Sequence, residues 1–355
     1  CVPGSPNLEN LSHDMPDNTL WFCDLFVYWL QRWLQPKSRL SLGFPQSEII
    51  RYHGYPSEEY EVTTKDGYIL GVFRIPAGRN SRNTGKKPAV LLHHGTLGDC
   101  IHWISNLPNN SLGFLLADAG YDVWMGNSRG NTWSLKHKTL KPSQKEFWQF
   151  SFDEIGKYDI LAELCFIMNK TGQKDVYYIG TSEAAAAGFI ALYTYPELAR
   201  RVKVFFALGP VTTITHATSP LVTFARLPNF ILSQPWVTAF ITLLLSLQSR
   251  IDTYVAHFPA GAAVQNVIHW HQVQPRTDYF SLLFFLQPTA SREAQRRTPV
   301  AVWSGGRDKF ADPKDMAKLL PQISNLIYHE HFPSWGHLDF VWGLDATEKM
   351  YLKII

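Results

Sequence analysis

The sequence predicts an α/β protein built on a mostly parallel central sheet of about eight strands, with helices on both faces. Short runs of β-branched and aromatic residues alternate with helical patterns, as in strand-helix-strand units. The chain has 355 residues and is 45% hydrophobic and 14% aromatic, which is sufficient for a large core.

The expected strands occupy eight stretches: 59–65, 68–75, 88–93, 121–125, 175–180, 202–208, 299–304 and 325–331. The first two are joined by Lys65-Asp66-Gly67, which predicts an antiparallel hairpin at one edge of the sheet. Helical patterns lie between several of the strands, including 152–170 and 183–194, and this alternation predicts a mostly parallel sheet that is covered on both faces.

Ser182 lies at a junction between a strand and a helix. Residues 175–192 contain a β-branched and aromatic strand, the turn Gly180-Thr-Ser182-Glu-Ala184 and an alanine-rich helix. This pattern predicts a nucleophile elbow, a sharp turn that holds a serine hydroxyl clear of the sheet. Gly180 and Ala184 fit it, because the positions two residues before and after the serine must be small. A second interpretation is that Thr181 or Ser182 simply caps the helix.

Two later segments supply the partners that a serine nucleophile needs. Residues 299–308 form a strand and a glycine turn that ends in Asp308, and the loop after strand 325–331 presents His337. The order Ser182, Asp308, His337 is the chain order of α/β hydrolases, and each residue follows the carboxyl end of a strand. The sequence therefore predicts an α/β-hydrolase fold with these residues as a catalytic triad.

Other acids and histidines compete for these roles. Asp312 and Asp315 follow closely, but residues 311–315 are typical of a helix start with Asp312 as N-cap. His329 and His331 alternate along a strand, yet no established metal-ligand spacing accompanies them. We therefore expect no metal site, and the predicted chemistry needs no cofactor.

An oxyanion hole is expected beside the serine. The apolar strand 88–93 ends in a His-Gly pair and a glycine-rich loop, where the fold requires a donor. The backbone N–H groups of Thr96 and Glu183 are the predicted donors.

Several long runs of the chain resemble the acid lipase family of gastric and lysosomal lipases. The runs are His53–Val62, His94-Gly95, Trp103–Trp133, Thr253–Gly261, Gly306–Asp308 and His337–Phe340. The resemblance covers about residues 46–228, 249–271 and 299–350. It implies a secreted or lysosomal enzyme that cleaves carboxylic esters of triacylglycerols or sterols, with the predicted triad matching the family's position by position.

The chain departs from the family pattern close to the serine. The family's elbow usually reads Gly-His-Ser-Gln-Gly, whereas this chain has Thr181, Glu183 and Ala184, and Thr96 replaces the usual leucine after His-Gly. A carboxylate at Glu183 would oppose a developing oxyanion unless it points to water or is protonated. The alternative prediction is therefore a catalytically weak or inactive lipase-like protein that binds lipid or a partner through its cap.

The resemblance also sets the domain organisation. The sequence does not define the structure of the N-terminal segment 1–45, and residues 46–214 and 299–355 are expected to form the hydrolase core. Residues 215–298 take the place of the family's helical cap, but this insertion is shorter, and 229–248 and 272–298 do not match the pattern.

Partner predictions follow from charge and hydropathy. Residues 227–249 lack charge, which favours a cap helix or a segment at a lipid surface over a membrane span. We expect a lipid ester substrate at an interface, with peripheral contact to the lipid. The net charge of +3, without a basic run, does not indicate a nucleic acid partner, and no obligate protein partner is evident.

Processing signals are sparse. Asn10, Asn109 and Asn169 begin glycosylation sequons, which support secretion only together with the resemblance. Residues 20–30 make a poor signal peptide. The four cysteines do not form a dense framework, and free thiols are expected at Cys100 and Cys165.

Overall fold

The computed structural model describes residues 45–81, 85–219, 260–263, 265–266, 269–270 and 298–355. Nearly all of segment 1–45, most of the insertion 215–298 and the whole uncharged stretch 227–249 lie outside the described residues.

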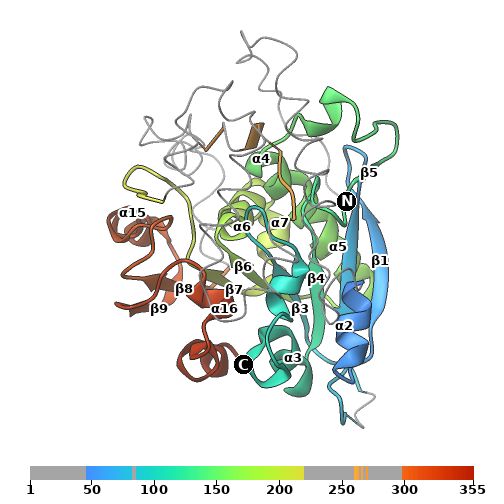
Figure 1. The fold of residues 1–355 in the computed structure, drawn as a ribbon, viewed down its shortest axis with the longest axis horizontal. Coiled ribbons are helices and arrows are strands. Elements are labelled where there is room, and N and C mark those ends of the chain that lie inside the picture. The colour runs from blue at the N-terminus through green and yellow to red at the C-terminus, as the bar shows by residue number, and fades with distance from the viewer. Residues whose placement is uncertain (1–44, 82–84, 220–259, 264, 267–268, 271–297) are drawn as a thin grey trace, which may run out of the picture.

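One mixed sheet forms the centre of the described structure (Figure 1). Its main strands follow the order β1-β2-β4-β3-β6-β7-β8-β9. Their bounds are β1 Glu58–Thr63, β2 Tyr68–Ile75, β3 Ala89–His93, β4 Asp122–Gly126, β6 Val176–Thr181, β7 Val202–Leu208, β8 Val300–Gly305 and β9 Leu326–Phe332. β1 and β2 pair antiparallel at one edge, β2 meets β4 antiparallel, and the remaining pairs are parallel. The predicted fold class and edge hairpin are confirmed.

A further strand, β5, was not predicted. It comprises only Lys136–His137 and pairs with β2. Two residues are too few to produce a detectable alternation of polar and apolar side chains.

Alternate side chains of the strands enter two separate cores. In β3, Leu91 packs in one cluster, whereas Val90 and Leu92 pack in the other. This is expected of a strand buried on both faces. β3 is buried along its whole length, as a central parallel strand should be.

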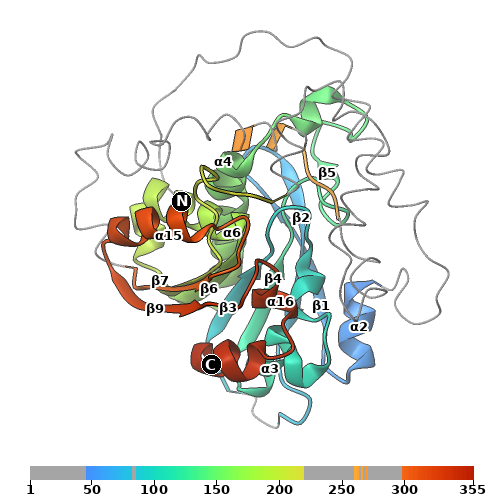
Figure 2. The ribbon, with the colours of Figure 1, turned by 60° about the vertical axis from the view of Figure 1, so that its left-hand side comes forward.

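Helices cover both faces of the sheet (Figure 2). The first core is closed by α5, α6 and α15 and the second by α2, α3 and α16. Their bounds are α2 Gln46–Tyr52, α3 Leu112–Asp118, α5 Leu161–Thr171, α6 Glu183–Thr194, α15 Pro313–Leu319 and α16 Asp339–Trp342. No helix in the described ranges is long and apolar enough to cross a bilayer.

The helical pattern predicted for 152–170 forms three consecutive pieces. α4 (Phe152–Glu154) starts at a Ser151 capping box, a π-helical segment covers Ile155–Ile160, and α5 then ends at Gly172. Gly172 has a left-handed φ of 62°, a conformation that glycine adopts without strain. The π-helical segment carries Asp159, which is buried.

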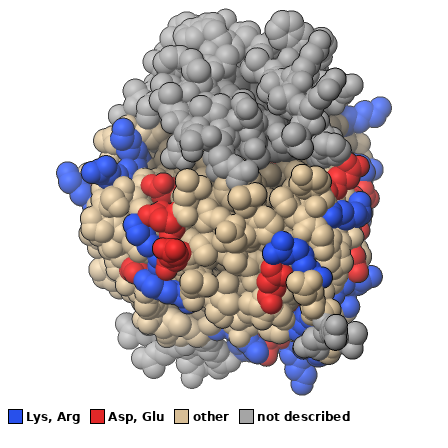
Figure 3. Space-filling view, turned by 60° about the horizontal axis from the view of Figure 1, so that its bottom comes forward, with Lys and Arg blue, Asp and Glu red and all other residues tan. Residues whose placement is uncertain are grey.

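Surface charge is mixed on the face shown in Figure 3. Acidic and basic side chains of the described residues form small interspersed groups around a largely uncharged centre.

Candidate active site

Ser182 occupies a strained turn between β6 and α6. Its φ is 57° and its ψ is −120°, a conformation that residues other than glycine rarely adopt. Its side chain makes no capping hydrogen bond to the helix, so the capping interpretation does not account for the hydroxyl. Gly180 permits the tight turn, because a Cβ there would lie 2.8 Å from the Ala184 carbonyl oxygen.

Three side chains from distant parts of the chain meet at this turn. His337 Nε2 lies 2.8 Å from Ser182 Oγ, and His337 Nδ1 lies 2.8 Å from Asp308 Oδ2. The loops after β6, β8 and β9 carry the three residues, because parallel strands end at one edge of the sheet. The imidazole therefore has hydrogen-bonding contact with both the hydroxyl and the carboxylate.

Asp308 is oriented by its own loop. Its side chain is fully buried, and Oδ1 accepts the backbone N–H groups of Phe310 and Ala311 at 2.8 and 2.9 Å. This leaves Oδ2 for the imidazole. Asp312 caps α15 as predicted, by accepting the Lys314 N–H, and so it is occupied elsewhere.

The loop after β3 passes directly beside Ser182. A Cβ on Gly95 would lie only 2.7 Å from Ser182 Cβ, so this close approach requires glycine. Thr96 follows Gly95, and Glu183 is the first residue of α6, where a backbone N–H has no partner within the helix. Both predicted oxyanion donors therefore belong to segments that adjoin the serine.

Hydrogen bonds of the His94 side chain stabilise the loop after β3. Its Nδ1 donates to the Gly95 carbonyl at 2.8 Å, and its Nε2 accepts the Ser128 N–H at 3.1 Å. Complete burial lowers the pKa of His94 to about 4, although the bond to Gly95 opposes the shift. The ring is therefore neutral with its proton on Nδ1.

The Glu183 carboxyl is buried rather than directed to water. Its Oε2 accepts the Asn266 Nδ2–H at 2.7 Å and the Trp270 Nε1–H at 2.6 Å, and the Thr96 hydroxyl also hydrogen-bonds the carboxyl. Burial raises the pKa of Glu183, while these three donors lower it in part. Sequence reasoning did not predict these contacts, because Asn266 and Trp270 lie more than 80 residues further along the chain.

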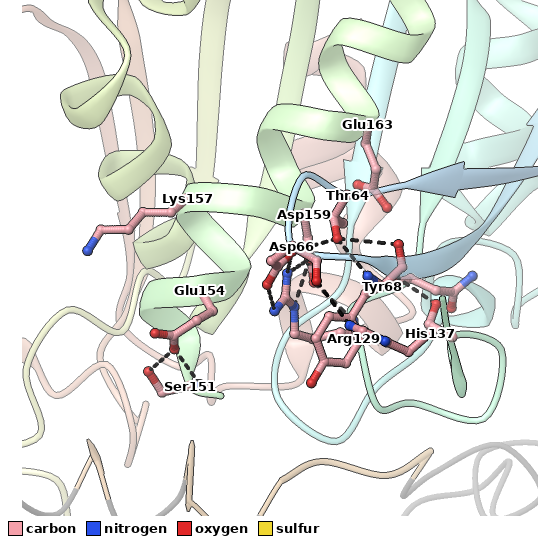
Figure 4. Close-up of polar contacts among 12 residues, drawn as sticks. Thr64, Asp66, Tyr68, Arg129, His137, Ser151, Glu154, Lys157, Asp159 and Glu163 are labelled. Carbon is pink, nitrogen blue, oxygen red and sulfur yellow. Dashed lines mark hydrogen bonds and ion pairs between the residues drawn. The ribbon is translucent and has the colours of Figure 1, made fainter. Parts of the chain in front are cut away.

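A buried ionic network supports the elements behind the site (Figure 4). Arg129 is 2% exposed and bonds two carboxylates, Asp159 from the π-helical segment and Asp66 from the edge hairpin. Its guanidinium lies over the Tyr68 ring, 4.1 Å from the centroid. Sequence reasoning missed this network, although Arg129 lies within the run Trp103–Trp133 and Asp66 within the predicted hairpin turn.

The remaining candidate positions lie apart from the serine. Asn109 and Asn169 are exposed, and Asn10 lies outside the described residues. His329 and His331 both hydrogen-bond Ser304. Among the described residues, no group of three or more His, Cys, Asp or Glu side chains is placed to hold a metal ion. Cys100 and Cys165 are free thiols, as expected.

Fold and site together define the class. The strand order, the strained serine turn and the Ser-Asp-His chain order are those of an α/β hydrolase. A family model described as "alpha/beta hydrolase fold" matches residues 88–260, and one described as "Partial alpha/beta-hydrolase lipase region" matches residues 46–107.

Curated relatives narrow the class to a family. The chain is 45% identical to Lipase member M of Mus musculus, with 95% of this chain and 92% of the relative covered. It is 47% identical to lysosomal acid lipase/cholesteryl ester hydrolase of Homo sapiens, with coverages of 87% and 89%. It is 43% identical to gastric triacylglycerol lipase of Rattus norvegicus, with coverages of 87% and 90%. The chain belongs to the acid lipase family.

Similarity to solved structures supports the fold only, because the sequence identities are low. A Pseudomonas aeruginosa hydrolase matches with a TM-score of 0.54 at 14% identity, covering 83% of this chain and 98% of its own. A Pyrococcus furiosus esterase matches with a TM-score of 0.51 at 14% identity, covering 90% of this chain and 99% of its own.

Proposed function

We propose that this protein is a serine hydrolase that cleaves carboxylic esters of lipids through an acyl-enzyme intermediate. The observation that carries the proposal is the continuous hydrogen-bonded chain from Ser182 Oγ through His337 to Asp308. Three relatives whose names describe lipid hydrolysis, at 43–47% identity, support a lipid ester as substrate.

His337 serves as the general base. Its Nε2 takes the Ser182 proton as Oγ attacks the ester carbonyl, and it then returns this proton to the leaving alcohol. Asp308 accepts the Nδ1–H bond, which fixes the tautomer and stabilises the imidazolium that forms. Water then attacks the acyl-enzyme by the same route and releases the carboxylic acid.

The backbone N–H groups of Thr96 and Glu183 hold the oxyanion. They adjoin Ser182 on two sides, because Gly95 lets the loop approach and Glu183 opens α6. Donors fixed in advance are effective because they need no reorganisation when charge develops. This chemistry requires no metal or organic cofactor.

The insertion 215–298 acts as a shortened cap over the site. Support comes from its described residues Asn266 and Trp270, which contact α6 beside the serine. A cap with an uncharged stretch, 227–249, suits peripheral contact with a lipid surface. We place the protein in a secreted or lysosomal compartment, in keeping with relatives named as lysosomal and gastric lipases, and the exposed Asn109 and Asn169 are its candidate glycosylation sites.

Labelling with a fluorophosphonate probe tests the proposal. The native protein should become labelled at Ser182 and hydrolyse a triacylglycerol emulsion, and Ser182→Ala should do neither. A folded native protein that takes no label, or equal labelling of Ser182→Ala, would refute the proposal.

A second candidate function is lipid binding with weak or no turnover. The buried Glu183 carboxyl favours it, since a carboxylate there opposes the oxyanion. Binding to liposomes without hydrolysis of a short-chain ester would support this alternative, and steady hydrolysis would exclude it.

A further inference from the structure

Glu183 connects three segments of the protein at one buried point. It is the first residue of α6, next to Ser182, and the residue is only 4% exposed. Thr96 contacts it from the loop after β3, and Asn266 and Trp270 contact it from the insertion. Two of the chain's departures from the family pattern, Thr96 and Glu183, are therefore hydrogen-bonded to each other.

The insertion residues are themselves anchored to the core. Asn266 Oδ1 accepts the Phe152 N–H at 2.7 Å, where α4 begins. The Trp270 ring packs on Phe152 with centroids 4.2 Å apart. Asn266 and Trp270 are thus held against α4, and they fix the direction of the carboxyl to which they donate.

The surroundings of the carboxyl are neutral. Thr96, Asn266 and Trp270, which donate to it, carry no charge. Two nearby titratable groups are His337, which hydrogen-bonds Ser182, and Asp308, which hydrogen-bonds His337. A third is His269, whose ring stacks on Phe152. Burial lowers the pKa of His269, which favours its neutral form. No cation among the described groups that contact Glu183 offsets a negative charge on its carboxyl.

We propose that Glu183 is a positioning residue whose carboxyl holds the oxyanion loop, Asn266 and Trp270 against the elbow, and that its deprotonation slows acyl transfer. The inference rests on the proposed function. A protonated carboxyl keeps all three contacts by accepting two N–H groups and sharing its proton with the Thr96 hydroxyl. A carboxylate also keeps them, but it places a buried negative charge on the residue whose N–H binds the oxyanion. Deprotonation of Glu183 therefore adds to the pH profile a falling limb that is specific to this elbow.

Glu183→Gln tests the charge of the carboxyl separately from its positioning contacts. The amide carbonyl can accept the two N–H groups, and the amide NH₂ can donate to Thr96, so the geometry is preserved without a titrating group. The assay is p-nitrophenyl butyrate hydrolysis from about pH 4 to about pH 8, with kcat and KM determined separately. We expect native kcat to fall toward high pH through a titration that the variant lacks. At high pH the variant should exceed the native kcat by about tenfold, below the roughly 100-fold cost of losing one oxyanion donor.

Two further variants complete the test. Thr96→Val keeps the backbone N–H but removes one hydrogen bond to the carboxyl, so the falling limb of the native profile should move to higher pH. Glu348→Gln, at an exposed position, is the matched control and should leave the profile unchanged.

Parallel profiles for the native protein and Glu183→Gln would overturn the inference. If Glu183→Gln does not fold, an unshifted falling limb in Thr96→Val overturns it instead. Failure of the proposed function is a different result, because the native protein would then hydrolyse the ester no faster than Ser182→Ala at any pH.

Discussion

Replacing Arg129 by methionine should destabilise the protein in a pH-dependent way. The substitution keeps an unbranched apolar stem but removes the charge that faces Asp159 and Asp66 (Figure 4). The Asp159 side chain is fully buried, and the Asp66 side chain is 29% exposed. Neither described carboxylate would then retain its buried counter-charge.

The structure sets the expected magnitude. Removing one partner of a buried ion pair costs roughly 3–5 kcal/mol, and the lost cation-π contact with Tyr68 adds about 1 kcal/mol. The free energy of unfolding should therefore fall by roughly 4–6 kcal/mol near neutral pH. Arg74→Met is the matched control, because Arg74 also bonds two carboxylates but its side chain is 20% exposed. The control also loses a cation-π contact, with Trp124, and should cost only about 1–3 kcal/mol, because solvent reaches its ion pairs.

The cost should shrink in acid. Burial alone would raise the pKa of Asp66, but the hydrogen bonds and charge of Arg129 lower it, so this native stabilisation is lost as pH falls through the folded pKa. Burial raises the pKa of Asp159 even with Arg129 present, and removing the guanidinium raises it further. At about pH 5 the variant can protonate its unpaired carboxyls, which should recover at least about 1 kcal/mol.

Urea unfolding followed by tryptophan fluorescence and by circular dichroism measures this cost at both pH values. Coincident transitions would justify the two-state treatment. A cost for Arg129→Met no greater than that for Arg74→Met, or a cost equal at neutral and acid pH, would refute the reasoning.

Two other substitutions test the surroundings of the site. Gly95→Ala should abolish fluorophosphonate labelling while the fold survives, because the new Cβ would lie 2.7 Å from Ser182 Cβ; normal labelling rates would contradict the close approach. Glu163 is buried with its Oε2 3.3 Å from His93 Nε2, and burial and Asp159 raise its pKa well above the usual range. The folded state therefore holds a proton that the unfolded chain releases, and native stability is lost as pH rises above the unfolded pKa. Glu163→Gln should thus gain stability relative to the native protein between about pH 5 and about pH 8 in thermal unfolding, and a constant difference would count against this.

The inner strands β3, β4 and β8 were predictable because they are buried along their whole length and largely apolar, whereas the partly exposed β1 and β9 were predicted from their β-branched and aromatic residues. The eight main strands lie within one or two residues of their predicted positions, since each run is bounded by turn residues that cannot continue a strand. The hydrolase fold followed from the chain order of three residues at strand ends, which requires no knowledge of side-chain conformation.

Contacts between distant loops were not predictable in the same way. Arg129 and Asp66 are 63 residues apart, and their pairing depends on how the edge hairpin lies against the π-helical segment. The bond between Thr96 and Glu183 likewise depends on the course of a loop in which Leu97 adopts a φ of 62°. Periodicity reports which residues share a face of one element, but it contains no information on such contacts.

Ala184 and Glu183 both depart from the family's elbow pattern, but they have different physical consequences. At Gly180 a Cβ would meet the backbone of Ala184, whereas Ala184 carries its own Cβ in a buried position and its carbonyl accepts the Tyr178 hydroxyl at 2.7 Å. Steric crowding therefore requires glycine at position 180, before the serine, whereas alanine fits at position 184, after it. Glu183 differs, because an ionisable group buried among neutral donors costs free energy unless it stays protonated or its hydrogen bonds compensate. A structural role alone would be met by the neutral amide of glutamine, so the carboxyl is best explained by an effect of its charge on the adjacent chemistry.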